Sequence, residues 1–121
     1  MSKLRKNILL IEDDALLAEM YTMILREEGF EVSQIKDGRS AVQKNIAGFD
    51  IVLLDIRLPE VDGLEVLRSY RDRGFAKPII VLTNSPQVNL MQARKLGADG
   101  LLIKSHSNIG DVLKAIEKHL N

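Results

Sequence analysis

The chain has 121 residues, of which 45% are hydrophobic and 28% charged, the balance of one folded domain rather than a disordered segment. It contains 0 cysteines, which excludes disulfides, cysteine-rich zinc sites and thiol nucleophiles. Its 17 basic side chains balance 17 acidic ones, which argues against a general binder of polyanions, so we expect no direct contact with nucleic acid.

Short apolar runs alternate with longer amphipathic segments along the chain, and turn residues separate them. Continuous runs of β-branched residues and leucine are typical of strands buried on both faces of a parallel sheet, whereas apolar residues at helical spacing predict helices. In chain order, the patterns predict a strand at 8–11, a helix at 15–28, a strand at 31–36, a helix at 40–47, a strand at 51–54, a helix at 64–73, a strand at 79–82, a helix at 86–96, a strand at 101–103 and a helix at 109–120. Because residues 31–36 mix polar with apolar side chains, we expect a half-exposed edge strand there.

Residues with special backbone preferences mark the ends of the predicted helices. A glycine follows each of the first four helices, where a left-handed residue commonly ends a helix; these are Gly29, Gly48, Gly74 and Gly97. Ser85 is the expected N-cap of the fourth helix, with Pro86 in its first turn. Five strand–helix repeats predict an α/β fold with a parallel sheet, right-handed crossovers and helices on both faces.

The alternation runs through the whole chain without a linker or a low-complexity segment. No apolar run in the sequence is long enough for a membrane span or for the core of a signal peptide. We therefore expect residues 1–121 to form a single domain that is cytoplasmic and does not associate with a membrane.

Polar side chains follow four of the predicted strands: Glu12, Asp13 and Asp14 the first, Asp55 the third, Thr83 the fourth and Lys104 the fifth. Because ligands of open α/β sheets collect beyond the carboxyl ends of the strands, we expect these side chains to share one rim. Clustered carboxylates repel one another, and Mg²⁺ offsets this repulsion while keeping waters and a phosphate oxygen as ligands. Lysine and threonine can bind phosphoryl oxygens, so the set predicts phosphoryl transfer to a carboxylate nucleophile.

These residues resemble a known family. Glu12-Asp13, Thr83, Lys104 and the segment Asp55-Ile56-Arg57-Leu58-Pro59-Glu60-Val61-Asp62-Gly63 are similar to the receiver domain of two-component response regulators, over about residues 7–120. The resemblance implies a CheY-like, flavodoxin-like fold: a doubly wound five-stranded parallel sheet in the order 2-1-3-4-5 with five helices. It also implies a phosphoacceptor domain rather than a conventional enzyme, which catalyses only its own phosphorylation and slow dephosphorylation.

The resemblance assigns a role to each matching position. Asp55 would accept a phosphoryl group from a sensor histidine kinase or a phosphotransfer protein. The implied Mg²⁺ ligands are Asp13, Asp55 and the backbone carbonyl of Arg57, with Glu12 acting through a metal-bound water. Thr83 would move toward the phosphoryl group, and Lys104 would hold one of its oxygens. Phosphorylation would shift the surface of the fourth helix, fifth strand and fifth helix toward a downstream protein partner, in a monomer or weak homodimer.

Three positions depart from the family pattern. Leu101 stands where the fifth strand usually carries an aromatic residue, so coupling from the threonine must take another route. Asn84 stands where the residue is usually small, and crowding or an extra hydrogen bond there would alter turnover. Ser105 replaces a proline that follows a cis bond; because a cis bond before another residue costs about 2.5–4 kcal/mol, either the site imposes this strain or the bond is trans.

Other interpretations stay open at this point. The chain could be a phosphorylation-independent, receiver-like interaction module. An aspartate-nucleophile phosphatase would place a second acid where the chain has Arg57, and a flavodoxin-like cofactor carrier would not follow its first strand with three acids. We expect Asp14 to be exposed or to cap a helix rather than to bind metal, and Gly63 to shape a turn.

Overall fold

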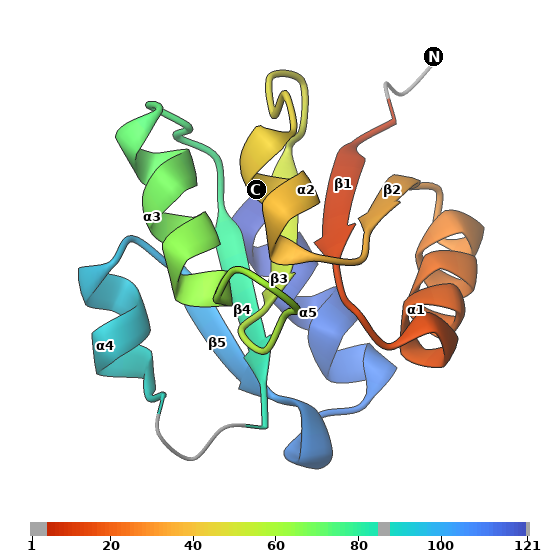
Figure 1. Ribbon diagram of the computed structural model, residues 1–121. Helices are drawn as coiled ribbons and strands as arrows, with labels where there is room; N and C mark the ends of the chain where they lie inside the picture. The colour runs from red at the N-terminus through yellow and green to blue at the C-terminus, as the bar shows by residue number, and fades with distance from the viewer. Residues whose placement is uncertain (1–4, 85–87, 121) are drawn as a thin grey trace.

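The computed structural model describes residues 5–84 and 88–120, and Figure 1 shows a twisted sheet with helices on both faces. Five parallel strands lie in the order β2-β1-β3-β4-β5. They are β1 (Asn7–Ile11), β2 (Glu31–Ile35), β3 (Ile51–Asp55), β4 (Ile79–Thr83) and β5 (Gly100–Ile103). The helices are α1 (Ala15–Glu27), α2 (Gly38–Gln43), α3 (Gly63–Asp72), α4 (Leu90–Lys95) and α5 (Ile109–Leu120), with a 3₁₀ turn η1 (Lys104–His106) after β5. The predicted fold class and strand order are confirmed.

Two hydrophobic cores hold the layers together, one on each face of the sheet. Helices α1 and α5 cover one face, where Leu25 and Ile116 pack against alternate residues of the central strands. Helices α2, α3 and α4 cover the other face through residues such as Leu67 and Ala93. All five residues of β3 and of β4 are buried, as expected for strands with a helix layer on both sides.

The two edge strands are less buried than the central ones. The half-exposed strand predicted at 31–36 is confirmed as β2, which ends one residue earlier, at Ile35. The prediction that residues 101–103 are buried on both faces was wrong, because every residue of β5 is only half-buried. The strand pairs with β4 alone, so its other side has no neighbour in the sheet.

The short helices α2 and α4 differ most from the sequence prediction. Helix α2 begins at Gly38 because the Asp37 side chain caps it, accepting from the Ser40 N–H at 2.7 Å, and it ends at Gln43 because Lys44 is extended. The predicted N-cap and first turn of α4 at Ser85 and Pro86 lie outside the described residues. Two capping-box hydrogen bonds between Asn89 and Gln92 start α4 at Leu90, later than predicted.

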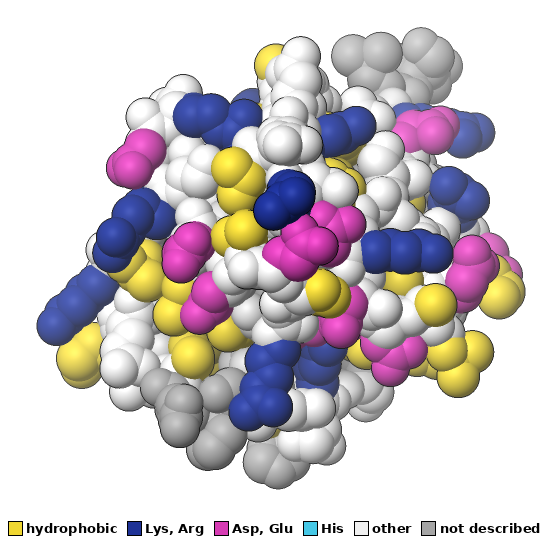
Figure 2. Space-filling view, viewed as in Figure 1, with side chains coloured by type: hydrophobic (Ala, Val, Ile, Leu, Met, Phe, Trp, Pro, Cys, Tyr) yellow, Lys and Arg dark blue, Asp and Glu magenta, His cyan; other side chains and the backbone are white. Residues whose placement is uncertain are grey.

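No helix in the described parts of the chain is long and apolar enough to cross a bilayer. Acidic and basic side chains intermingle over the face shown in Figure 2, in keeping with their equal numbers in the sequence. The described residues on this face of the molecule therefore form no large area of a single charge sign.

The buried Tyr70 side chain makes the stability of the fold depend on pH in the alkaline range. It is fully buried, and its hydroxyl donates to the Ala41 carbonyl at 2.6 Å. Burial raises the pKa of Tyr70 to about 12, so the neutral phenol stabilises the fold fully below about pH 10 and this contribution is lost as the pH rises toward 12. Replacing Tyr70 with phenylalanine should lower the free energy of unfolding at neutral pH by about 1 kcal/mol. Urea unfolding should show that the difference in free energy of unfolding between wild type and Tyr70→Phe becomes smaller above about pH 10. A difference that stays constant with pH would contradict this account.

Candidate functional site

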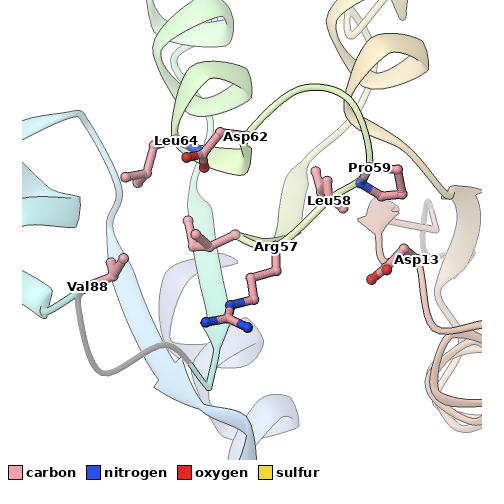
Figure 3. A pocket seen from close by; sticks show the side chains of 8 residues that line it. Asp13, Arg57, Leu58, Pro59, Asp62, Leu64 and Val88 are labelled. Atoms are coloured by element: carbon pink, nitrogen blue, oxygen red, sulfur yellow. The ribbon is translucent and has the colours of Figure 1, made fainter.

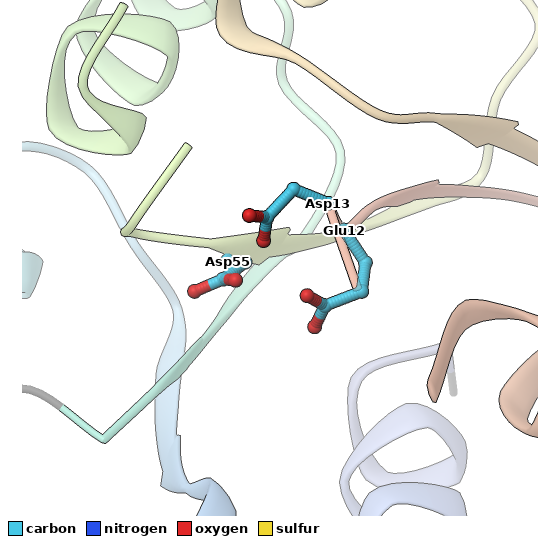
Figure 4. Close-up of side chains that lie close together, drawn as sticks. All are labelled: Glu12, Asp13 and Asp55. Carbon is cyan, nitrogen blue, oxygen red and sulfur yellow. The ribbon is translucent and has the colours of Figure 1, made fainter. Parts of the chain in front are cut away.

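Three carboxylates meet beyond the carboxyl ends of β1 and β3. Glu12 and Asp13 directly follow β1, and Asp55 is the last residue of β3. Parallel pairing of the two strands sets Ile11 beside Leu54, so the residues that follow them share one rim. Carboxylate oxygens of Glu12, Asp13 and Asp55 all lie within 4.8 Å of one another, and Figure 4 shows the three groups turned toward a common space.

Two of these carboxylates are withdrawn from water. Glu12 is 1% exposed and Asp55 is 4% exposed, whereas Asp13 is open to solvent. Burial, together with the nearby charge of Asp55, raises the pKa of Glu12 to about 7. One oxygen of Glu12, Oε2, accepts from the Asp14 N–H at 3.1 Å, while Oε1 has no well-aligned hydrogen bond within the described part of the chain.

Lys104 supplies the positive charge that this rim requires. Its Nζ donates to Asp55 Oδ2 at 3.0 Å and lies 2.6 Å from Glu12 Oε1, with 14% of the side chain exposed. Burial alone would lower the pKa of Lys104, but its contacts with Glu12 and Asp55 outweigh burial and raise it. Lys104 is therefore an ammonium ion that bridges two buried carboxylates.

The Lys104–Ser105 peptide bond is trans, as are all peptide bonds that the structure describes. The sequence left open whether this bond is a strained cis bond or a trans bond, and the trans alternative is confirmed. Lys104 faces Asp55 without a cis bond. The Ser105 N–H donates to Asn84 Oδ1 at 2.7 Å, across the ends of β5 and β4.

Backbone groups of the β3–α3 connection hold Asp55 in place. The Arg57 N–H donates to Asp55 Oδ1 at 3.1 Å, and the Gly63 N–H donates to the Ile56 carbonyl at 2.8 Å. Gly63 is the first residue of α3, and a Cβ atom there would overlap the Asp55 carbonyl oxygen and lie 2.6 Å from Ile56 Cα. Our interpretation of Gly63 as a turn residue was wrong, since its φ is not positive and close packing beneath Asp55 is what requires a glycine.

Two hollows open onto the carboxylates. A cleft of about 700 Å³ runs from Asp13 along the β3–α3 connection to Val88, and in Figure 3 the Arg57 side chain lies between these two residues. A smaller hollow of about 400 Å³ lies over the carboxylates themselves. Its lining consists of Glu12, Asp13, Asp14, Asp55, Arg57, Asn84 and Lys104.

The remaining candidates take different positions. Thr83 is fully buried at the end of β4, one residue beyond the register partner of Asp55, and it does not line the hollow over the carboxylates. Asp14 caps α1 by accepting from the Leu17 N–H at 3.1 Å, which confirms the capping role expected for it. Asn84 was recognised in the sequence only as a departure from the family, and the structure adds it to the lining.

The donor set fits a hard divalent cation. Glu12, Asp13 and Asp55 each offer one carboxylate oxygen, and these three oxygens lie within 4.8 Å of one another. Carboxylate oxygens are the ligands that Mg²⁺ prefers, and it commonly binds through one or two of them. The acidic cluster is therefore suited to Mg²⁺.

A family model described as the response regulator receiver domain matches residues 8–117, nearly the whole chain. The chain belongs to this family.

Solved receiver domains have the same fold as this chain. TrrA from Thermotoga maritima, in complex with Mg²⁺–BeF, superposes on this receiver domain with a TM-score of 0.84 at 31% identity, covering 95% of this chain and 99% of TrrA. A CheY-like receiver domain protein from Methanospirillum hungatei gives a TM-score of 0.82 at 27% identity, covering 97% and 94% of the two chains.

Curated relatives that match this receiver domain include named regulators of two kinds. The DNA-binding response regulator MtrA of Mycobacterium tuberculosis is 40% identical over 107 residues, 86% of this chain and 46% of MtrA. The sensory transduction protein RegX3 of the same organism is 35% identical over 102 residues, 84% of this chain and 45% of RegX3. The receiver domain thus spans less than half the length of these relatives. The expectation of no nucleic-acid contact finds no support in them, since MtrA is named as DNA-binding.

Proposed function

We propose that this receiver domain is a phosphorylation-dependent switch, in which Asp55 accepts a phosphoryl group from a sensor histidine kinase or a phosphotransfer protein. The observation that carries the proposal is the buried Asp55 carboxylate, 3.0 Å from the Lys104 ammonium, beneath an open hollow. An Asp55 carboxylate oxygen attacks phosphorus, the new O–P bond forms as the P–N bond to histidine breaks, and the electron pair leaves with the imidazole. The domain catalyses only this step and the slow hydrolysis of the acyl phosphate.

The residues that would hold Mg²⁺ are Asp13, Asp55 and the Arg57 carbonyl, with Glu12 acting through a water. The ion, when bound, neutralises charge on the phosphoryl oxygens. The acidic cluster and the Mg²⁺–BeF complex of the relative TrrA both support this assignment. Arg57 would contribute its backbone carbonyl, while its side chain lines the neighbouring cleft.

Phosphate recognition and output involve the ends of β4 and β5. Lys104 would hold a phosphoryl oxygen, and Thr83 would move toward the group and report its presence. The surface of α4, β5 and α5 would then shift toward a downstream protein partner. Leu101 packs half-buried against the core beneath α2, α3 and α4, so no aromatic rotamer reports from that position. That the protein is a monomer or weak homodimer, and that residues 1–121 are a single receiver domain, stay predictions.

Beryllofluoride, a stable mimic of the phosphoryl group, tests the proposed function. With Mg²⁺ present, titration into the wild-type protein should shift amide NMR signals of Asp55, Thr83 and Lys104 to saturation. Asp55→Asn should abolish the shifts because the amide offers no anionic oxygen to the beryllium. Asp72→Asn, an exposed change at the far end of α3, should leave them intact. A folded wild-type protein that shows no shift would favour the phosphorylation-independent module.

Replacing the Asp13 carboxylate should affect Mg²⁺ affinity without lowering the stability of the fold. Asp13→Asn should weaken Mg²⁺ binding by at least about tenfold, because an amide oxygen replaces an anionic ligand. The metal-free variant should be no less stable than the wild type, since one like charge leaves the cluster. Isothermal titration calorimetry measures the affinity, with Asp72→Asn as the control. Unchanged Mg²⁺ affinity in Asp13→Asn would remove Asp13 from the ligand set.

A further inference from the structure

The ends of β4 and β5 are joined by a hydrogen bond that uses the side chain of Asn84. Thr83 and Ile103 are register partners in the parallel pair, so Asn84 and Lys104 leave the sheet side by side. The Asn84 side-chain oxygen accepts from the Ser105 N–H at 2.7 Å, a link between residues 21 apart in the chain. The side chain is therefore tied to the turn that carries Lys104.

This hydrogen bond satisfies a donor that the turn leaves open. Ser105 lies in the first turn of η1, where backbone N–H groups lack partners within the helix. The N-cap residue, Ile103, offers no side-chain acceptor, and the oxygen of Asn84 takes that place from the neighbouring strand. Because an N–H group can only donate, the amide oxygen of Asn84 must face Ser105.

The turn also decides where the Lys104 ammonium lies. Lys104 enters the hollow over the carboxylates, where its Nζ reaches Asp55 Oδ2 at 3.0 Å. The following bond is trans and the following residue is serine, so no proline ring restricts the backbone there. Asn84 borders the same hollow and fixes the backbone of the residue directly after Lys104.

We propose that Asn84 is a positioning residue: its hydrogen bond to the Ser105 N–H holds the β5–η1 turn so that Lys104 reaches Asp55. Its effect on phosphoryl transfer rests on the proposed function, whereas its effect on the turn does not. Asn84→Ala frees the turn, and Lys104 then spends less time in the conformation that contacts Asp55. We expect beryllofluoride affinity and the rate of phosphorylation by acetyl phosphate to fall about threefold to tenfold, the range that one hydrogen bond supplies.

A double-mutant cycle tests the contact itself. Ser105→Pro removes the N–H donor, and its ring restricts the turn in place of the hydrogen bond, so Asn84→Ala should have no further effect on beryllofluoride affinity in that background. Ser105→Ala keeps the N–H, so in that background Asn84→Ala should still cause its full loss. Asn84→Asp retains the acceptor oxygen and should restore protection of the Ser105 amide. An Asn84→Ala effect of equal size in the proline and alanine backgrounds would overturn the proposal.

Amide hydrogen exchange of the metal-free protein gives a readout that needs no phosphoryl chemistry. Exchange at Ser105 should be about tenfold faster in Asn84→Ala than in the wild type, while core amides of β3 and β4 exchange at unchanged rates. Equal exchange at Ser105 in both proteins would overturn the positioning role. If the wild type bound no beryllofluoride but Ser105 lost protection in Asn84→Ala, the proposed function would fail while the role of Asn84 in the turn would stand.

Discussion

Replacing Lys104 with alanine is expected to slow phosphorylation of Asp55 by roughly 10²-fold and to lower the free energy of unfolding of the metal-free protein by about 2 kcal/mol. Both effects follow from one position, because Lys104 Nζ contacts Asp55 and Glu12 at once. Without it, two buried carboxylates face each other with no cation between them. The stability loss should be below the roughly 3–5 kcal/mol of a fully enclosed pair, since the rim opens to water.

The two effects of Lys104→Ala can be measured separately. Urea unfolding with and without Mg²⁺ reports stability, and saturating Mg²⁺ should recover much of the loss by restoring positive charge at the carboxylates. Acetyl phosphate labelling, followed by intact mass, reports the rate. Lys114→Ala, an exposed change on α5, is the matched control and should alter neither quantity. Equal stability of Lys104→Ala and wild type in the absence of Mg²⁺ would contradict the bridging role of the ammonium.

Replacing Gly63 with alanine should be among the most destabilising single-methyl changes near the site, at about 3 kcal/mol. The new Cβ would overlap the Asp55 carbonyl oxygen and lie 2.6 Å from Ile56 Cα. Both neighbours are backbone atoms, so α3 must move away from β3 or the end of β3 must shift. Either movement displaces the Asp55 carboxylate, and beryllofluoride affinity should fall together with stability.

A glycine in open space gives the control for Gly63→Ala. Gly48 has a φ of +95°, and no atom lies within 4 Å of the place that a Cβ would take, so Gly48→Ala meets only backbone strain, about 1 kcal/mol. Urea unfolding should therefore rank Gly63→Ala as clearly more destabilising than Gly48→Ala. Beryllofluoride affinity should change only for Gly63→Ala. The reverse order of stability would show that close packing beneath Asp55 is not what requires Gly63.

Elements with long, regular patterns could be predicted from the sequence because burial imposes the pattern. The central strands are continuous apolar runs with a helix layer on each side, and residues 109–120 form α5 as the apolar stripe predicts. The order of polar residues after the strands also predicted that the carboxylates after β1 and at the end of β3 share one rim with Lys104. Thr83, predicted to join them, is fully buried and does not line the hollow. Parallel pairing brings the strand ends together irrespective of loop details.

What the sequence could not predict depends on particular three-dimensional contacts. Helix α2 ends at Gln43, although apolar residues continue at helical spacing, because Lys44 turns the chain into an extended conformation. The burial of β5 depends on its place at the edge of the sheet, which composition does not encode. The hydrogen bond between Asn84 and Ser105 could not be predicted, because neither residue type indicates the other as its partner. Only the register of β4 and β5 brings the two residues together.

Chemical trapping of the modified residue tests the central claim, that Asp55 is the phosphoacceptor, most directly. The wild-type protein is incubated with Mg²⁺ and acetyl phosphate, treated with borohydride, which reduces an aspartyl phosphate to homoserine, and digested for tandem mass spectrometry. The expected result is homoserine at position 55, dependent on Mg²⁺ and lost when Mg²⁺ is chelated. Homoserine at another acidic position, or a folded protein that remains unmodified, would contradict the account.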